Sequence, residues 1–176
     1  LLAALLTACA GMPPLVTPPD FAPNVPIAAV GVYTDGIGKC SAVAIEPTLA
    51  LTAEHCLGGI SEKFDRVFTY VGLDGAGEPR VQQRRVLRVE FDPKDGADIA
   101  VLQIDPATPF PEWATVAVDL PEGGELLTIV GWGCTDGQPT VRPAVYSFTS
   151  GTVGYFYGSL CFGDSGGGLF NADGEL

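Results

Sequence analysis

Short runs of apolar and β-branched residues, each ended by a turn signal, make up most of the sequence after about residue 27. Gly (23 residues) and Pro (15 residues) are abundant, and almost no stretch has the 3.6-residue apolar period of an amphipathic helix. The pattern predicts an all-β protein, and the regular spacing of strands and turns indicates a barrel or a sandwich. We expect strands at 27–33, 41–46, 49–53, 65–72, 81–91, 98–104, 126–132, 141–153 and 166–170.

The composition is that of a folded, acidic protein. Of the 176 residues 47% are hydrophobic and 17% are charged, which is typical of a globular chain rather than a disordered one. The formal net charge is −12. Nucleic-acid phosphates require a basic surface, so this charge argues against a nucleic-acid partner. The acidity is most simply interpreted as a contribution to solubility.

The first residues have the pattern of an export signal rather than of a fold. An apolar run ends in small residues, but a starting Met and a basic segment are missing, so we expect the sequence to be a fragment at this end. Residues 6–9 (LTAC) resemble the bacterial lipobox, in which the cysteine, here Cys9, is acylated and anchors the protein in the cell envelope. Ordinary cleavage at residues 8–10, an A-x-A site that leads to secretion, is the alternative. We assign residues 1–10 to this signal and residues 11–26, with their six prolines, to a tether.

Export implies an oxidising compartment, in which cysteines pair. If Cys9 is the anchor, Cys40, Cys56, Cys134 and Cys161 remain. Four cysteines allow three sets of two disulfides, and the sequence alone does not choose among them.

Three separate places carry chemistry. The only histidine, His55, lies in LTAEHC, Asp98 begins the apolar run DIAVLQI, and Ser165 is followed by three glycines. A serine hydroxyl becomes a nucleophile when a base removes its proton, and an imidazole base works best when a buried carboxylate orients it. The glycines indicate a backbone that exposes the hydroxyl and directs N–H groups at a reacting oxygen.

The motifs LTAEHC, DIAVL and CFGDSGG, in this order, resemble the trypsin-like (chymotrypsin-fold) serine endopeptidases over about residues 27–176. The resemblance implies two six-stranded antiparallel β-barrels, the first over about 27–110 and an incomplete second over about 111–176. It implies protein or peptide substrates and neither a cofactor nor a metal. Ser165 would be the nucleophile, His55 the general base and then acid, and Asp98 the residue that orients His55.

The same resemblance assigns further residues around the nucleophile. The N–H groups of Gly163 and Ser165 would form the oxyanion hole, and Asp164 would support that hole as a buried carboxylate paired with a cation. No Lys or Arg precedes Lys39, so the usual activating cleavage after a basic residue is not visible. Another cation, a different cleavage or an inactive protein are the open alternatives. Ser159, six residues before the nucleophile, would lie at the bottom of the specificity pocket, which favours cleavage after apolar or aromatic residues.

The resemblance also pairs Cys40 with Cys56, which leaves Cys134 and Cys161 for each other, a pair that departs from the usual pattern. Glu54 stands where the family usually has alanine, and it places a carboxylate beside His55. The sequence ends at GLFNADGEL, before the remaining strands of a second barrel, so we also expect a truncation at this end.

Two other functions deserve comparison. The stretch around Ser165 also satisfies G-x-S-x-G, the nucleophile turn of the α/β-hydrolases, but in those enzymes the histidine follows the serine, whereas His55 precedes it. A proteolytically inactive homologue that acts as a cell-surface binding module is the alternative from another class. The missing activation site and Glu54 favour it, and the complete set of serine, histidine and aspartate argues against it.

Overall fold

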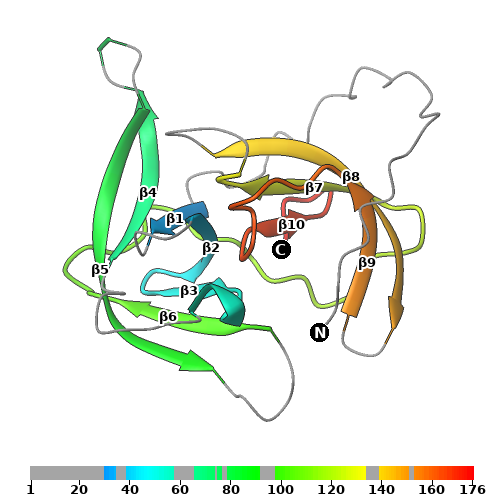
Figure 1. Ribbon diagram of the computed structural model, residues 1–176, viewed down its shortest axis with the longest axis horizontal. Coiled ribbons are helices and arrows are strands. Elements are labelled where there is room, and N and C mark those ends of the chain that lie inside the picture. The colour runs from blue at the N-terminus through cyan, green and yellow to red at the C-terminus, as the bar shows by residue number, and fades with distance from the viewer. Residues whose placement is uncertain are drawn as a thin grey trace.

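The structure is a computed structural model that describes residues 30–34, 39–57, 66–73, 75–76, 79–91, 98–133, 139–150 and 153–176. In these ranges, ten strands form a closed six-stranded barrel and a four-stranded antiparallel sheet, which lie side by side (Figure 1), and a short 3-10 helix follows the third strand. The predicted all-β fold is confirmed, with a six-stranded first barrel and a second unit that has four strands in the described ranges. None of the helices in the described ranges is long and apolar enough to cross a membrane.

The barrel has the strand order β1-β2-β3-β6-β5-β4, and it closes because β1 pairs with β4. A turn at Pro47 and Thr48 joins β2 to β3, and the helix η2 (Glu54–Leu57) follows β3. The barrel strands are β1 (Val30–Thr34), β2 (Lys39–Glu46), β3 (Leu49–Thr52), β4 (Arg66–Leu73), β5 (Pro79–Phe91) and β6 (Ala100–Ile104).

The second sheet has the order β10-β7-β8-β9. Its strands are β7 (Leu126–Gly131), β8 (Thr140–Ser150), β9 (Val153–Gly158) and β10 (Gly168–Phe170). The expected single strand over 141–153 is wrong, because β8 ends at Ser150 and a separate strand, β9, begins at Val153. Glycines at both ends of GYFYG hid β9 in the sequence, although its aromatic residues favour a strand.

The period-2 alternation of the strands builds the core of the barrel. In β6 the residues Ala100, Leu102 and Ile104 are buried and point inward, whereas Gln103 is exposed. A single apolar cluster fills the barrel with these three residues and with Ala42, Ala44, Ala50, Leu57, Val67, Val86 and Phe110.

One apolar cluster joins the barrel to the second sheet. Val43 of β2 packs with Val130 of β7, Phe170 of β10, Trp132 and Ala114, all of them buried. The Ala114 N–H also donates to the carbonyl of Ala44 at 2.8 Å. The two units therefore meet along β2, the strand that carries Cys40 and Ser41.

A buried cation fixes the chain that leaves the barrel. Arg84 of β5 is 1% exposed, donates to the carbonyls of Pro109 (3.1 Å) and Gln82 (3.2 Å), and lies 5.3 Å from the centre of the Phe110 ring. Burial lowers the pKa of the Arg84 guanidinium, because a low-dielectric interior disfavours the charged form. The carbonyls and the aromatic face offset this cost and attach the 109–110 segment to β5.

Candidate active site

His55 and Asp98 meet because β3 and β6 are neighbours in the barrel. The register pairs Thr52, the last residue of β3, with Ala100, the first residue of β6. His55 follows that pair on one strand and Asp98 precedes it on the other, so both lie at the same end of the barrel. The pairing of two strands thus brings together residues that are 43 positions apart.

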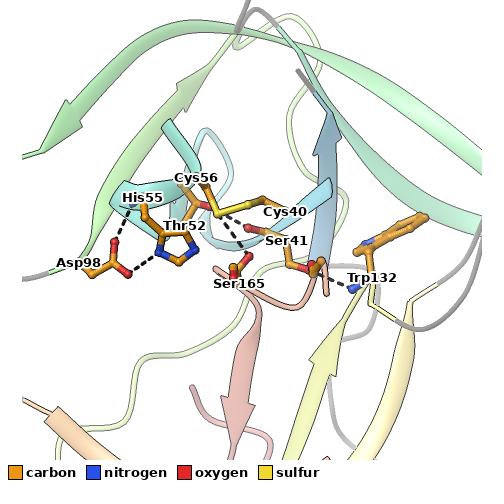
Figure 2. Close-up of a disulfide and its surroundings, with 9 residues drawn as sticks. Cys40, Ser41, Thr52, His55, Cys56, Asp98, Trp132 and Ser165 are labelled. Atoms are coloured by element: carbon orange, nitrogen blue, oxygen red, sulfur yellow. Dashed lines mark hydrogen bonds and ion pairs between the residues drawn. A yellow bond between two sulfur atoms is a disulfide. The ribbon is translucent and has the colours of Figure 1, made fainter. Parts of the chain in front are cut away.

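Asp98 holds His55 with both carboxylate oxygens. Oδ2 lies 2.6 Å from His55 Nδ1, and Oδ1 accepts the His55 backbone N–H at 2.7 Å (Figure 2). Because a carboxylate oxygen accepts, this contact places a proton on Nδ1, and in the neutral imidazole Nε2 then carries the lone pair. The exposed fractions of the two side chains are 57% and 56%, so this carboxylate is not the buried one that the motif reasoning assumed.

A disulfide fixes the turn that carries His55. Cys40 of β2 and Cys56 of η2 form a bridge with a Cα–Cα distance of 6.1 Å, and the pairing expected from the resemblance is confirmed. One His55 ring nitrogen and the two sulfurs lie within 4.8 Å of one another. Both sulfurs belong to the disulfide and offer no thiolate, so this cluster is not a metal site.

Ser165 lies against the same end of β3. The next residue, Gly166, has φ +79°, and a side chain there would collide with Ser41 O and Thr52 Oγ1 and lie 2.9 Å from Ala53 N. Only glycine allows this approach, which brings the serine next to the turn of His55. Figure 2 shows the His55 ring between Asp98 and Ser165. Within the described residues, no hydrogen bond joins the His55 ring to the Ser165 hydroxyl. In many ligand-free sites of this kind the contact is loose.

Two backbone N–H groups at and beside Ser165 are available for a ligand. Gly163 has φ +104°, a left-handed conformation that favours glycine, and its carbonyl points toward β2 and accepts the Ser41 hydroxyl at 2.8 Å. Among the described residues, neither the Gly163 N–H nor the Ser165 N–H donates to another backbone group. These are the two donors that the sequence assigned to an oxyanion hole.

Asp164 is buried and has three partners. Its Oδ1 accepts the Gly133 N–H at 2.9 Å, its Oδ2 accepts the Cys161 N–H at 2.7 Å, and Arg142 Nη2 lies 2.5 Å from Oδ2. The side chains of Arg142 and Asp164 are 15% and 3% exposed. Arg142 is therefore the cation that pairs with Asp164, and the sequence analysis did not predict it. The signal was present, since Arg142 is the only Lys or Arg after Lys94.

The remaining predicted residues lie around this centre or outside the described ranges. Ser159 is exposed, as are Leu160 (60%) and Phe162 (90%), close to Ser165 in sequence. Cys161 is disulfide-bonded, but Cys134 lies outside the described residues, so the bridge between them stays a prediction. Cys9, the export signal and the tether also lie outside the described residues. Glu54 is half-buried beside His55.

A closed β-barrel beside a second antiparallel sheet, with a His–Asp pair and a glycine-flanked serine at their junction, is the arrangement of a peptidase domain. A family model described as the trypsin-like peptidase domain matches residues 40–176. The chain therefore belongs to the trypsin-like peptidase family, as its three motifs predicted. No curated protein matches the chain in a sequence comparison.

Solved structures show the same fold at low sequence identity. An inactive form of Rv3671c from M. tuberculosis H37Rv is 19% identical with a TM-score of 0.66, over 93% of this chain and 81% of that one. A scabies mite inactivated protease paralogue, S-D1, is 15% identical with a TM-score of 0.70, over 85% and 78%. A serine endoprotease from Yersinia pestis is 24% identical with a TM-score of 0.62, over 87% of this chain and 53% of that one.

Proposed function

We propose that the protein is a serine endopeptidase that hydrolyses peptide bonds through Ser165, His55 and Asp98. The observation that carries the proposal is the His55–Asp98 pair, which two hydrogen bonds of 2.6 and 2.7 Å join, beside a serine in a glycine-rich turn. Family membership supports peptide or protein substrates.

The first half of the reaction forms an acyl-enzyme. Ser165 Oγ attacks the scissile carbonyl carbon while its proton passes to Nε2 of His55, and Asp98 stabilises the imidazolium. The negative oxygen of the tetrahedral intermediate accepts hydrogen bonds from the N–H groups of Gly163 and Ser165. Each such donor contributes roughly 10²- to 10³-fold to the rate. The intermediate collapses as His55 passes the proton to the leaving amine, and the C–N bond breaks.

The second half regenerates the enzyme. Water attacks the acyl carbon and gives its proton to Nε2, and the new tetrahedral intermediate breaks its bond to Ser165 Oγ, which takes the proton back from His55. The carboxylic acid product leaves. The original proton of Ser165 leaves with the amine, and a proton from the attacking water replaces it, so water is the only reactant needed besides the peptide.

This proposal includes activity without an N-terminal cleavage. In a protein that needs such a cleavage, the new amine supplies the cation for the buried carboxylate. Here Arg142 is already 2.5 Å from Asp164, so the loop that carries the two N–H donors has its support in the uncut chain.

A covalent probe tests the proposal. The purified protein should be labelled by a fluorophosphonate at Ser165, and both His55→Ala and Ser165→Ala should abolish labelling while the far-UV circular dichroism stays unchanged. A folded wild-type protein that resists the probe would refute the proposal and favour the inactive binding module. One of the similar structures is an inactivated protease paralogue of the scabies mite, so this outcome has a precedent in the fold.

We propose apolar or aromatic residues before the cut. No acidic residue occurs between Gly137 and Gly163, so the stretch that contains Ser159 offers no carboxylate for a substrate Lys or Arg. A buried, unpaired substrate cation would lose several kcal/mol, on the order of 3–5. The exposed side chains of Leu160 and Phe162 add apolar surface next to the nucleophile. A fluorogenic peptide library should show this preference, and selection of Lys or Arg would contradict it.

An envelope location is proposed from LTAC at residues 6–9. Expression in a bacterial host should give an acylated, membrane-associated protein, and Cys9→Ser should prevent acylation. Mass spectrometry that finds an unmodified mature start at Gly11 would instead support ordinary secretion.

A further inference from the structure

The hydroxyl of Ser41 joins the barrel to the turn that carries Ser165. Ser41 lies on β2 next to Cys40, is 0% exposed, and makes four hydrogen bonds. Its N–H donates to the Ser165 carbonyl at 2.7 Å, and its carbonyl accepts Thr52 Oγ1 at 2.8 Å. Its hydroxyl lies 2.8 Å from the Gly163 carbonyl and 2.9 Å from the Trp132 N–H. Figure 2 shows Ser41 between Ser165 and Trp132.

The direction of both hydroxyl bonds follows from the partners. A backbone N–H can only donate, so the Ser41 oxygen accepts from Trp132. A carbonyl can only accept, so the Ser41 hydrogen goes to Gly163. Alanine at this position would leave the buried Gly163 carbonyl and the Trp132 N–H without the hydroxyl that satisfies them here.

The position of the Gly163 carbonyl affects the geometry of the candidate oxyanion hole. Its oxygen belongs to the planar peptide that joins Gly163 to Asp164, so fixing that oxygen fixes the orientation of the whole peptide. Gly163 has φ +104°, and glycine can adopt many other conformations at low cost, so this turn needs an external support.

Two independent supports act on the turn from opposite ends. The Asp164 carboxylate accepts the Cys161 N–H at 2.7 Å and so holds the beginning of the turn. Ser41 holds its middle at the Gly163 carbonyl and its end at the Ser165 carbonyl. The two proposed donors, Gly163 N–H and Ser165 N–H, lie between these attachments.

We propose that Ser41 is a positioning residue that keeps the Gly163 and Ser165 N–H groups directed at the developing oxyanion. The inference rests on the proposed peptidase function. The alternative is a purely structural role, in which Ser41 only joins the barrel to the second sheet. The two roles predict different effects when the Ser41 hydroxyl is lost. With a positioning role, its loss lowers turnover and the order of the 161–165 turn. With a purely structural role, its loss lowers only stability.

The experiment compares Ser41→Ala with Ser41→Thr, which keeps a hydroxyl, and with Arg84→Met, which removes a buried polar group elsewhere in the barrel. For each folded variant, kcat and KM on a peptide substrate are measured together with amide hydrogen exchange of residues 161–165 by mass spectrometry. Urea denaturation gives the stability of each.

Ser41→Ala should lower kcat by about 10-fold with KM within about twofold, less than the roughly 10²- to 10³-fold loss for a direct donor. Exchange in the 161–165 segment should be faster by a similar factor, and Ser41→Thr should restore both values. Arg84→Met should be less stable but should change neither.

Two results would overturn the proposal. One is a folded Ser41→Ala protein with wild-type kcat and exchange; the other is a loss of activity that merely follows stability, as large in Arg84→Met as in Ser41→Ala. If the wild-type protein fails the fluorophosphonate test, the proposed function fails separately. The exchange measurement still decides whether Ser41 orders the turn, because it requires no turnover.

Discussion

At the scale of single residues, Arg142 is the side chain on which the candidate site most depends without taking part in the proposed chemistry. It places a cation beside a carboxylate that is 3% exposed and that also accepts two backbone N–H groups. A buried pair of this kind adds little net stability, but removing one partner leaves an uncompensated buried charge, which costs about 3–5 kcal/mol. The Asp164 carboxylate would then move toward water and carry the turn with it.

Substitution of Arg142 tests this dependence. Arg142→Met should lower kcat roughly 100-fold, comparable with the loss of an oxyanion donor, and lower the free energy of unfolding by about 3 kcal/mol. Arg142→Lys, which keeps the charge but not the planar fork, should fall between the two proteins. Kinetics and urea denaturation give both values, with the intact N-terminus checked by mass spectrometry. Wild-type protein that becomes active only after N-terminal cleavage would contradict the role assigned to Arg142.

At the scale of elements, the pairing of β3 with β6 and the bridge from β2 to η2 determine where His55 lies. The strand pairing sets the distance to Asp98, and the bridge Cys40–Cys56 closes a loop of 16 residues that contains β3. In the chain-entropy account, a loop of this length contributes about 3 kcal/mol by restricting the unfolded chain.

Removing this bridge should affect stability and the order of η2 together. The double variant Cys40→Ser, Cys56→Ser should lose about 3 kcal/mol of unfolding free energy, and amide exchange in η2 should become faster. Chemical denaturation and hydrogen exchange measure the two effects. Equal stability of the variant and the wild-type protein would show that the bridge is not needed to hold the turn.

The sequence predicted those parts of the fold and site that have local signals. LTAEHC, DIAVL and CFGDSGG indicated His55, Asp98 and Ser165, and alternation indicated most of the strands. Arg142 and Ser41 were missed because their partners lie 22 and 122 residues away, in the turn before β10, and no local pattern reports such a contact. β9 was missed because glycines weaken its propensity, whereas pairing with β8 stabilises it.

At the scale of the whole molecule, the barrel and the second sheet share a core through Val43. This residue is 1% exposed and packs in one cluster with Val130, Trp132 and Phe170 of the other unit. Hydrogen bonds from Ser41 cross the same boundary. Neither unit can lose its structure without exposing part of the other's apolar surface, so we expect them to unfold together.

Thermal or urea unfolding should therefore be a single transition. Far-UV circular dichroism and tryptophan fluorescence, which includes the buried Trp132, should give coincident curves. Val43→Ala should lower the common midpoint, with a loss of about 1–3 kcal/mol for the truncated side chain. Two separate transitions, or a Val43→Ala effect on only one signal, would show that the units are independent.

Because the His55–Asp98 pair is exposed, solvent screens the attraction between its two charges. More than half of each side chain faces water, where the high dielectric constant and dissolved ions weaken the attraction between charges. In the free protein, Asp98 thus acts on His55 mainly through geometry. A peptide that covers the pair would displace that water and lower the local dielectric constant, so the same carboxylate would stabilise the imidazolium more strongly during the reaction. In the proposed reaction, the bound peptide would thus complete the electrostatic environment of the site.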